Sequence, residues 1–191
     1  RVVLADVASG TLTVAPLFYV SPTQINFYVP SSHPAGESEV RVSGGGAFDA
    51  RFPVNVQPAI PNFFSANANG KGVATGQAVL TTPGSPARAE TDLANCPPSG
   101  GVCTARRINP GAVGQDLFLV LYGTGFPPQH ERPTVYIDGQ PVTVDYNGPQ
   151  GQYLGLDQVN LRIPPELRTP GVRTIEMEYM GYRSNAVTVL F

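Results

Sequence analysis

Gln24-Ile25-Asn26-Phe27-Tyr28-Val29-Pro30 and Gln158-Val159-Asn160-Leu161-Arg162-Ile163-Pro164 are two copies of one seven-residue pattern. Each copy reads Gln, β-branched, Asn, apolar, any residue, β-branched, Pro. A turn with Pro and Gly follows each copy, at 34–36 and at 169–171, and an alternating strand follows each turn, at 39–42 and at 173–177. An internal repeat of this kind decides the fold class. The sequence therefore predicts two related β domains in tandem.

The composition supports an all-β protein. The 191 residues include 21 Gly and 20 Pro, which separate short β-rich runs, as in β domains with many turns. We expect two tandem immunoglobulin-like β-sandwiches, one over 1–57 and one over 58–191. The second contains a long insertion at 82–114, and the prolines at 58 and 61 mark the boundary. A single helical turn is expected at 164–168.

Several strands can be placed individually. Asp138-Gly139 is a strong hairpin signal between apolar runs at 135–137 and 142–144. A similar hairpin is expected between 2–5 and 11–14. The run at 116–122 is apolar on both faces, which is typical of a central strand. After a glycine turn at 44–46, residues 48–56 alternate as the last strand of the first domain.

The distribution of charged and apolar residues argues against two classes of partner, nucleic acids and membranes. Charged residues make up 14% of the chain, the net charge is −2, and no basic cluster exceeds Arg106-Arg107, so no nucleic-acid partner is expected. No apolar run reaches the about 18 residues of a membrane-spanning helix, so no membrane insertion is expected. The chain begins at Arg1 without a signal-peptide pattern. We interpret it as a mature chain whose export signal has been removed, located outside the cell or on its surface.

The two cysteines, Cys96 and Cys103, flank a short loop rich in Pro and Gly. A redox pair would have two intervening residues, and a metal site would need more ligands than the distant His33 and His130 provide. A disulfide is the favoured interpretation and indicates an oxidising compartment; two free surface thiols are the alternative. Closing so short a loop stabilises a fold by roughly 2–3 kcal/mol.

The sequence offers little chemistry, and we expect no enzymatic activity, no cofactor and no metal. Asp138 and Asp157 could act as acid and base, but such residues usually form turns. Glu176 and Glu178 share one face of a strand, which is usually a solvated face. The polar residues of the repeated pattern and its two prolines are interpreted as structural, with the amides bonded to a neighbouring loop: Gln24, Asn26, Pro30, Gln158, Asn160 and Pro164.

Two stretches resemble a known family. Residues 18–30 form the first, and the second comprises Tyr122-Gly123-Thr124-Gly125, residues 137–141 and residues 155–160. Together they resemble the uncharacterised C-terminal domain family named after Solibacter, over nearly the whole chain except the insertion at 82–114. The resemblance implies secretion by bacteria and immunoglobulin-like sandwiches of the plexin and transcription-factor type. It implies no activity and no catalytic residues.

Aligning the two repeats exposes an asymmetry. Residues 134–146 correspond to about 2–14, but strands at 59–64 and 116–122 precede this hairpin only in the second domain. The first domain is therefore predicted to be truncated at its N-terminal side, with an open sheet edge and a bare apolar interior, which is costly for a monomer. An upstream segment, the second domain or a neighbouring molecule could cover it.

These observations favour a non-enzymatic extracellular structural protein. We expect a self-assembling filament or surface-layer subunit, a homo-oligomer or polymer completed by neighbouring chains through strands or loops. The insertion at 82–114 and the last strand, 186–191, are the candidate donors. The candidate assembly contacts are Val2, Leu4, Val187, Val189 and Phe191. The alternative is a carbohydrate-binding or adhesive module of a larger secreted protein, in which tyrosines would stack on a surface glycan.

Overall fold

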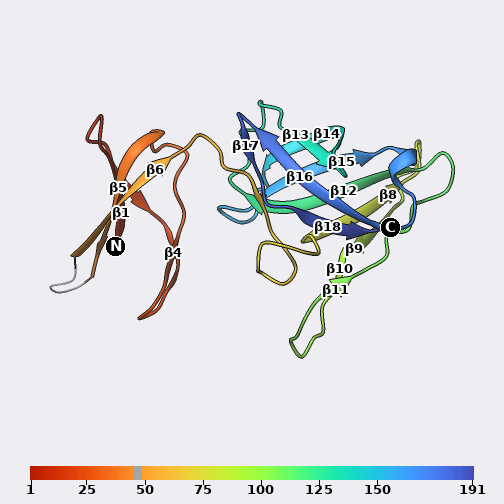
Figure 1. Cartoon of the computed structure of the whole chain (residues 1–191), viewed down its shortest axis with the longest axis horizontal. Helices are drawn as coiled ribbons and strands as arrows, with labels where there is room; N and C mark the ends of the chain where they lie inside the picture. The colour runs from red at the N-terminus through yellow and green to blue at the C-terminus, as the bar shows by residue number, and fades with distance from the viewer. Residues whose placement is uncertain (45–48) are drawn as a thin grey trace. The chain divides into compact units, whose positions relative to one another are not determined.

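The computed structural model describes residues 1–44 and 49–191, and these are built from β-strands (Figure 1). Strands make up 52% of the structure and form several antiparallel sheets, and no α-helix occurs in the described residues. A 3-10 turn, η1 (Pro165–Leu167), lies where one helical turn was predicted. The all-β prediction is confirmed. The chain divides into two compact units, Arg1–Pro58 and Ala59–Phe191.

The first unit contains a four-stranded sheet and a two-stranded ribbon. The sheet has the order β2-β1-β5-β6, made by β1 (Val2–Asp6), β2 (Leu12–Ala15), β5 (Gly36–Ser43) and β6 (Asp49–Val56). The ribbon pairs β3 (Leu17–Val20) with β4 (Ile25–Phe27). The predicted hairpin between the first two strands is confirmed. Of the predicted turn at 44–46 and the strand from Phe48, residues 45–48 lie outside the described part.

The core of the first unit is small. Val2, Leu4, Ala15 and Val40 are buried, and four partly buried side chains pack against them: Ile25, Phe27, Val42 and Val56. The ribbon therefore covers one face of the sheet through β4. A buried histidine ties the segment between β4 and β5 to the sheet, since the two ring nitrogens of His33 lie 2.8 Å from Thr13 Oγ1 on β2 and 2.9 Å from Ser38 Oγ on β5. So few buried apolar groups give little hydrophobic stabilisation.

The second unit contains one large sheet and a small hairpin. The ten-stranded sheet follows the path β17-β16-β13-β14-β15-β12-β8-β9, with β18 paired to β16 and β7 paired to β12. The predicted Asp138-Gly139 hairpin joins β13 to β14, and the strand predicted to be central, β12, pairs on both sides. The strands are β7 (Asn62–Phe63), β8 (Gly76–Thr81), β9 (Arg88–Asp92), β10 (Ala94–Asn95), β11 (Thr104–Ala105), β12 (Asp116–Thr124), β13 (Thr134–Ile137), β14 (Gln140–Pro149), β15 (Asp157–Ile163), β16 (Val172–Tyr179), β17 (Tyr182–Arg183) and β18 (Val187–Leu190).

The core of the second unit is continuous and much larger. Alternate residues of β12 and β15 are fully buried, and so are the inward-facing residues of β13, β16 and β18. The segment predicted to be an irregular insertion, 82–114, contributes to this core. Leu93 and Ile108 are buried in it, β9 pairs with β8, and β10 pairs with β11. The insertion is thus a part of the fold and contains strands that its Pro and Gly content concealed.

The strand registers show which positions of the two units are equivalent. In the first unit Val2 lies opposite Val42 and Leu4 opposite Val40; in the second, Val135 lies opposite Met177 and Ile137 opposite Ile175. Even a local irregularity is shared. We call the strand that carries the repeated pattern the signature strand, which is β4 in the first unit and β15 in the second. Its pairing is interrupted once in each unit, between Leu17 and Tyr19 and between Val144 and Tyr146. The β2-β3 segment therefore corresponds to the single long strand β14.

The units differ at the edge of the signature strand that faces away from β3 in the first unit and from β14 in the second. In the second unit β15 pairs with β14 on one edge and with β12 on the other, and β8 continues the sheet. In the first unit β4 pairs with β3, and no other strand of residues 1–44 and 49–58 pairs with it. The free edge of β4 thus occupies the position where the sheet of the second unit continues with β12, β8 and β9.

Candidate functional site

The polar residues of the repeated pattern have the same role in both units. Gln24 Nε2 donates to Asn26 Oδ1 at 2.7 Å, and Gln158 Nε2 donates to Asn160 Oδ1 at 2.8 Å. The two amides of each pair lie two residues apart on one strand and so project from the same face. The hydrogen bonds found in the described residues join the two amides of each pair to one another, and none joins them to a neighbouring loop, which was the expectation. Their role is local and structural.

The acidic residues considered as acid-base candidates have structural partners. Asp138 accepts a hydrogen bond from the Thr174 backbone N–H at 2.8 Å and lies 2.9 Å from Arg173 Nη1. The bond from Thr174 is the main reason why the pKa of Asp138 is lowered. Burial raises the pKa of Asp157, whose Oδ2 accepts a bond from the Phe126 N–H at 3.0 Å. Each carboxyl group fixes a turn or strand end.

Glu176 and Glu178 lie on the exposed side of β16 with Arg183. Arg183 is 3.8 Å from Glu176 and 3.1 Å from Glu178, and its guanidinium group stacks over Tyr136. The bond with Glu178 raises the pKa of Arg183. Two carboxylates held by one arginine on a solvated strand form a surface ion-pair network, which contributes little to stability.

The described residues contain no cluster of three or more metal-binding side chains, and no helix among them has the length and apolarity to cross a membrane. A pocket of about 410 Å³ in the second unit is lined by Phe63, Phe64, Ser65, Ala68, Gly70 and Thr75. The residues that line it carry no titratable side chain. The exposed tyrosines are spread over different elements: Tyr19 on β3, Tyr153 in a loop and Tyr182 on β17.

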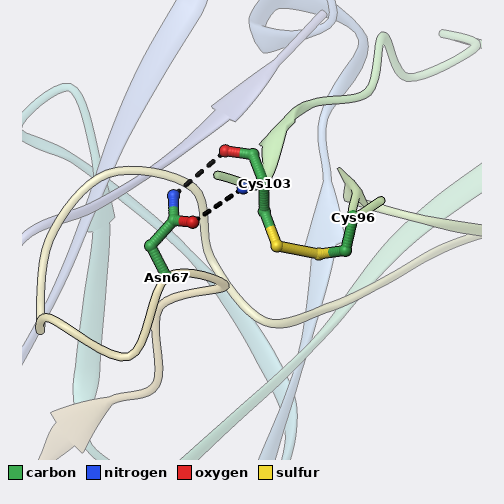
Figure 2. The surroundings of a disulfide bond; sticks show 3 residues. All are labelled: Asn67, Cys96 and Cys103. Carbon is green, nitrogen blue, oxygen red and sulfur yellow. Dashed lines mark hydrogen bonds between the residues drawn. A yellow bond between two sulfur atoms is a disulfide. The ribbon is translucent and has the colours of Figure 1, made fainter. Parts of the chain in front are cut away.

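Cys96 and Cys103 form the predicted disulfide (Figure 2). β10 ends directly before Cys96, and β11 begins directly after Cys103. The short β10-β11 hairpin therefore connects the disulfide-closed loop to the rest of the unit, next to the buried Leu93. Asn67, on a distant loop, clamps the ring. Its Nδ2 donates to the Cys103 carbonyl at 3.0 Å, and its Oδ1 accepts from the Cys103 N–H at 2.7 Å. The ring is therefore attached to the unit at a fixed place.

The five residues predicted as assembly contacts have side chains that are buried within their own units. Val2 and Leu4 lie in the core of the first unit, and Val187, Val189 and Phe191 lie in the core of the second. The last strand is also paired to β16, so it is not free to be donated. Apolar alternation identified residues that face inward, and these residues are covered by their own unit.

A different set of side chains in the first unit is uncovered. We call it the open face: Leu17, Val20, Val29, Phe52 and Val54. These residues point toward the same side as the core, because Leu17 and Val20 lie opposite Phe27 and Ile25, and Phe52 lies opposite the buried Val40. Phe52 is 54% exposed.

The second unit shows what normally covers these positions. By register, Phe52 and Val54 correspond to Val187 and Val189, which are 0% and 1% exposed. Val29 follows the signature strand at the position of Ile163, which is also fully buried. In the second unit these side chains pack in one core with Leu117, Leu119 and Leu121 of β12. The open face is therefore an interior surface that lacks the covering strands.

A second apolar surface lies on the edge strand β2. Leu12 and Val14 are 60% and 55% exposed. The β2 surface and the Leu17, Val20 and Val29 part of the open face lie in a stretch of thirty residues, 7–36, that contains no Asp, Glu, Lys or Arg. This absence of charge, rather than any apolar motif, could have located the surface.

Comparison with known protein families, with curated proteins and with solved structures finds no match.

Proposed function

We propose that this chain is a non-enzymatic, extracellular structural protein that assembles with copies of itself. Each unit is interpreted as an immunoglobulin-like β-sandwich, the first being truncated. The observation that carries the proposal is the open face. Phe52, Val54 and Val29 are exposed in the first unit, whereas the equivalent side chains of the second unit are buried: Val187, Val189 and Ile163. Contiguous exposed apolar surface of this kind marks an interaction site.

Two further observations support a place outside the cell. The Cys96–Cys103 disulfide is weakly consistent with an oxidising compartment. The resemblance to the Solibacter-type C-terminal domains points the same way, toward secreted bacterial proteins.

The carboxylates that were considered as acid-base candidates, Asp138, Asp157 and Glu176, all have structural partners, which fits a scaffold rather than an enzyme.

The test is the mass of the full-length chain as a function of concentration. Multi-angle light scattering is expected to show growth beyond the monomer in the micromolar range, and negative-stain microscopy is expected to show ordered fibres or sheets. A monomer at every concentration, with the amides of β5 and β6 fully protected from hydrogen exchange, would contradict the proposal. Glycan-array binding that is lost in Tyr153→Ala would instead favour the carbohydrate-binding module.

A further inference from the structure

The free edge of β4 presents backbone groups with which another strand could pair. The Ser21 N–H donates to the Gln24 carbonyl at 2.8 Å, and Val20 and Ile25 form the next pair. Because hydrogen-bonded and non-hydrogen-bonded pairs alternate along an antiparallel ladder, Ile25 and then Phe27 direct their backbone groups away from β3. Both side chains pack toward the core. Their unpaired backbone groups are a template for another strand.

The second unit shows what such a strand would look like. The positions equivalent to Ile25 and Phe27 are Val159 and Leu161, which pair with Leu121 and Leu119 of β12. All these side chains are 0% exposed. The acceptor therefore calls for an antiparallel strand with branched apolar side chains at two positions separated by one residue.

The edge strand β2 carries this pattern. The Asp6 N–H donates to the Thr11 carbonyl at 2.9 Å, and Ala5 pairs with Leu12. By the same alternation, Leu12 and Val14 direct their N–H and C=O groups away from β1. Their side chains are more than half exposed. The β2 edge thus offers two apolar residues at the required spacing, with free backbone groups.

The edge strands β6 and β9 and the Pro141 position of β14 are protected against such pairing, and β2 is not. The position of the second unit equivalent to Val14 is Pro141, which has no N–H to donate. The edge strand β6 contains Pro53, and the edge strand β9 has three charged side chains, Arg88, Glu90 and Asp92. Charges and prolines are the usual protection of exposed edges. Residues 7–36 contain no charged side chain on either partner surface, so nothing repels β2 from β4.

We propose that β2 of a second copy pairs antiparallel with the free edge of β4, with Val14 opposite Ile25 and Leu12 opposite Phe27. This inference rests on the proposed self-assembly and names its contact. The donated side chains take the place of Leu121 and Leu119 and cover the open face at Phe52 and Val54. Donor and acceptor are different surfaces of one chain, so the contact is head-to-tail and each copy can bind two others.

The experiment uses full-length variants and light scattering. Val14→Pro removes the N–H that would pair with β4 and breaks no hydrogen bond to β1. Val14→Lys keeps this N–H but places a charge on a side chain that is already exposed, which disfavours burial in the contact. Phe52→Glu places a charge on the acceptor face. Each variant alone is expected to be monomeric at concentrations where the unaltered chain assembles. Far-UV circular dichroism checks that each variant folds.

Mixing gives the sharper readout. Val14→Pro retains an acceptor and Phe52→Glu retains a donor, so their mixture is expected to stop at a one-to-one heterodimer. Pro141→Val, at the matched position of the second unit, is expected to assemble like the unaltered chain. If both Val14 variants or Phe52→Glu still assemble, or if the mixture remains monomeric, the contact is wrong although self-assembly stands. If the unaltered chain never assembles, both proposals fail.

Discussion

Val54 and Val189 are the same residue at equivalent positions of two sheets, and truncating each to Ala measures how far each unit is covered. Val54 is 36% exposed and Val189 is 1% exposed. Val→Ala removes two methyl groups. At about 0.8 kcal/mol for each buried group, Val189→Ala loses about 1.6 kcal/mol of transfer free energy, and the cavity raises the loss to about 2–3 kcal/mol.

In a dilute monomer Val54→Ala is expected to lower the stability of the first unit by about 1 kcal/mol or less. The removed methyl groups are partly in water, and the open face leaves no enclosed cavity. In the assembled protein the same substitution is expected to approach the loss seen for Val189→Ala, because the face is then covered.

The assay is native-state hydrogen exchange read separately in the two units, since two units need not unfold together. Amides of β5 and β6 report on the first unit, and amides of β16 and β18 report on the second. If Val54→Ala lowers the opening free energy in the monomer by the same amount as Val189→Ala, the open face is already covered and the comparison of the units is refuted.

Three further outcomes are expected, each in the second unit. Replacing Cys96 and Cys103 together by Ser is expected to speed exchange at residues 90–110, with a local loss of about 2–3 kcal/mol, while β12 and β15 stay protected; general unfolding would contradict this. Burial raises the pKa of Asp157 above 3.8, so the folded form binds this proton more tightly. The contribution of Asp157 to stability therefore rises as the pH falls through the raised pKa, and the difference in urea midpoint between the unaltered chain and Asp157→Asn should show that sign. Gly125 has φ +69, and a Cβ added there would lie 2.3 Å from a backbone carbonyl; Gly125→Ala is expected to lose more than about 2 kcal/mol, whereas Gly139→Ala, with φ +79 and open space around it, should lose less in thermal unfolding.

The sequence predicted the strands that have a strong local signal. The Asp138-Gly139 turn and the apolar run of β12 were placed correctly, because turn chemistry and a continuous apolar run are encoded in adjacent residues. The alignment of the repeats was one residue out at its start and then drifted further: Val2 was matched to Thr134, whereas the registers match it to Val135. Tyr146 was matched to Val14, whereas the registers match it to Tyr19. The drift arises within the first hairpin, because residues 7–10 form a longer turn than Asp138-Gly139 and β1 pairs with β2 over more residues than β13 pairs with β14.

The candidate contacts could not be predicted in the same way. Alternation shows which residues share a face, but it does not show which face another strand covers. Val187 and Phe52 have the same apolar character and equivalent positions, yet one is buried and the other is exposed. That difference depends on strands distant in the chain, β8 and β12, and becomes visible only when the two units are compared position by position.

The uncharged stretch 7–36 has a consequence for the conditions in which the protein would work. Contacts between ions weaken as salt concentration rises, because mobile ions screen them. A joint made from Leu12, Val14, Ile25 and Phe27 contains no ion to screen, and sulfate-type salts strengthen the burial of apolar surface. The proposed contact would therefore hold equally well at low and at high salt concentration.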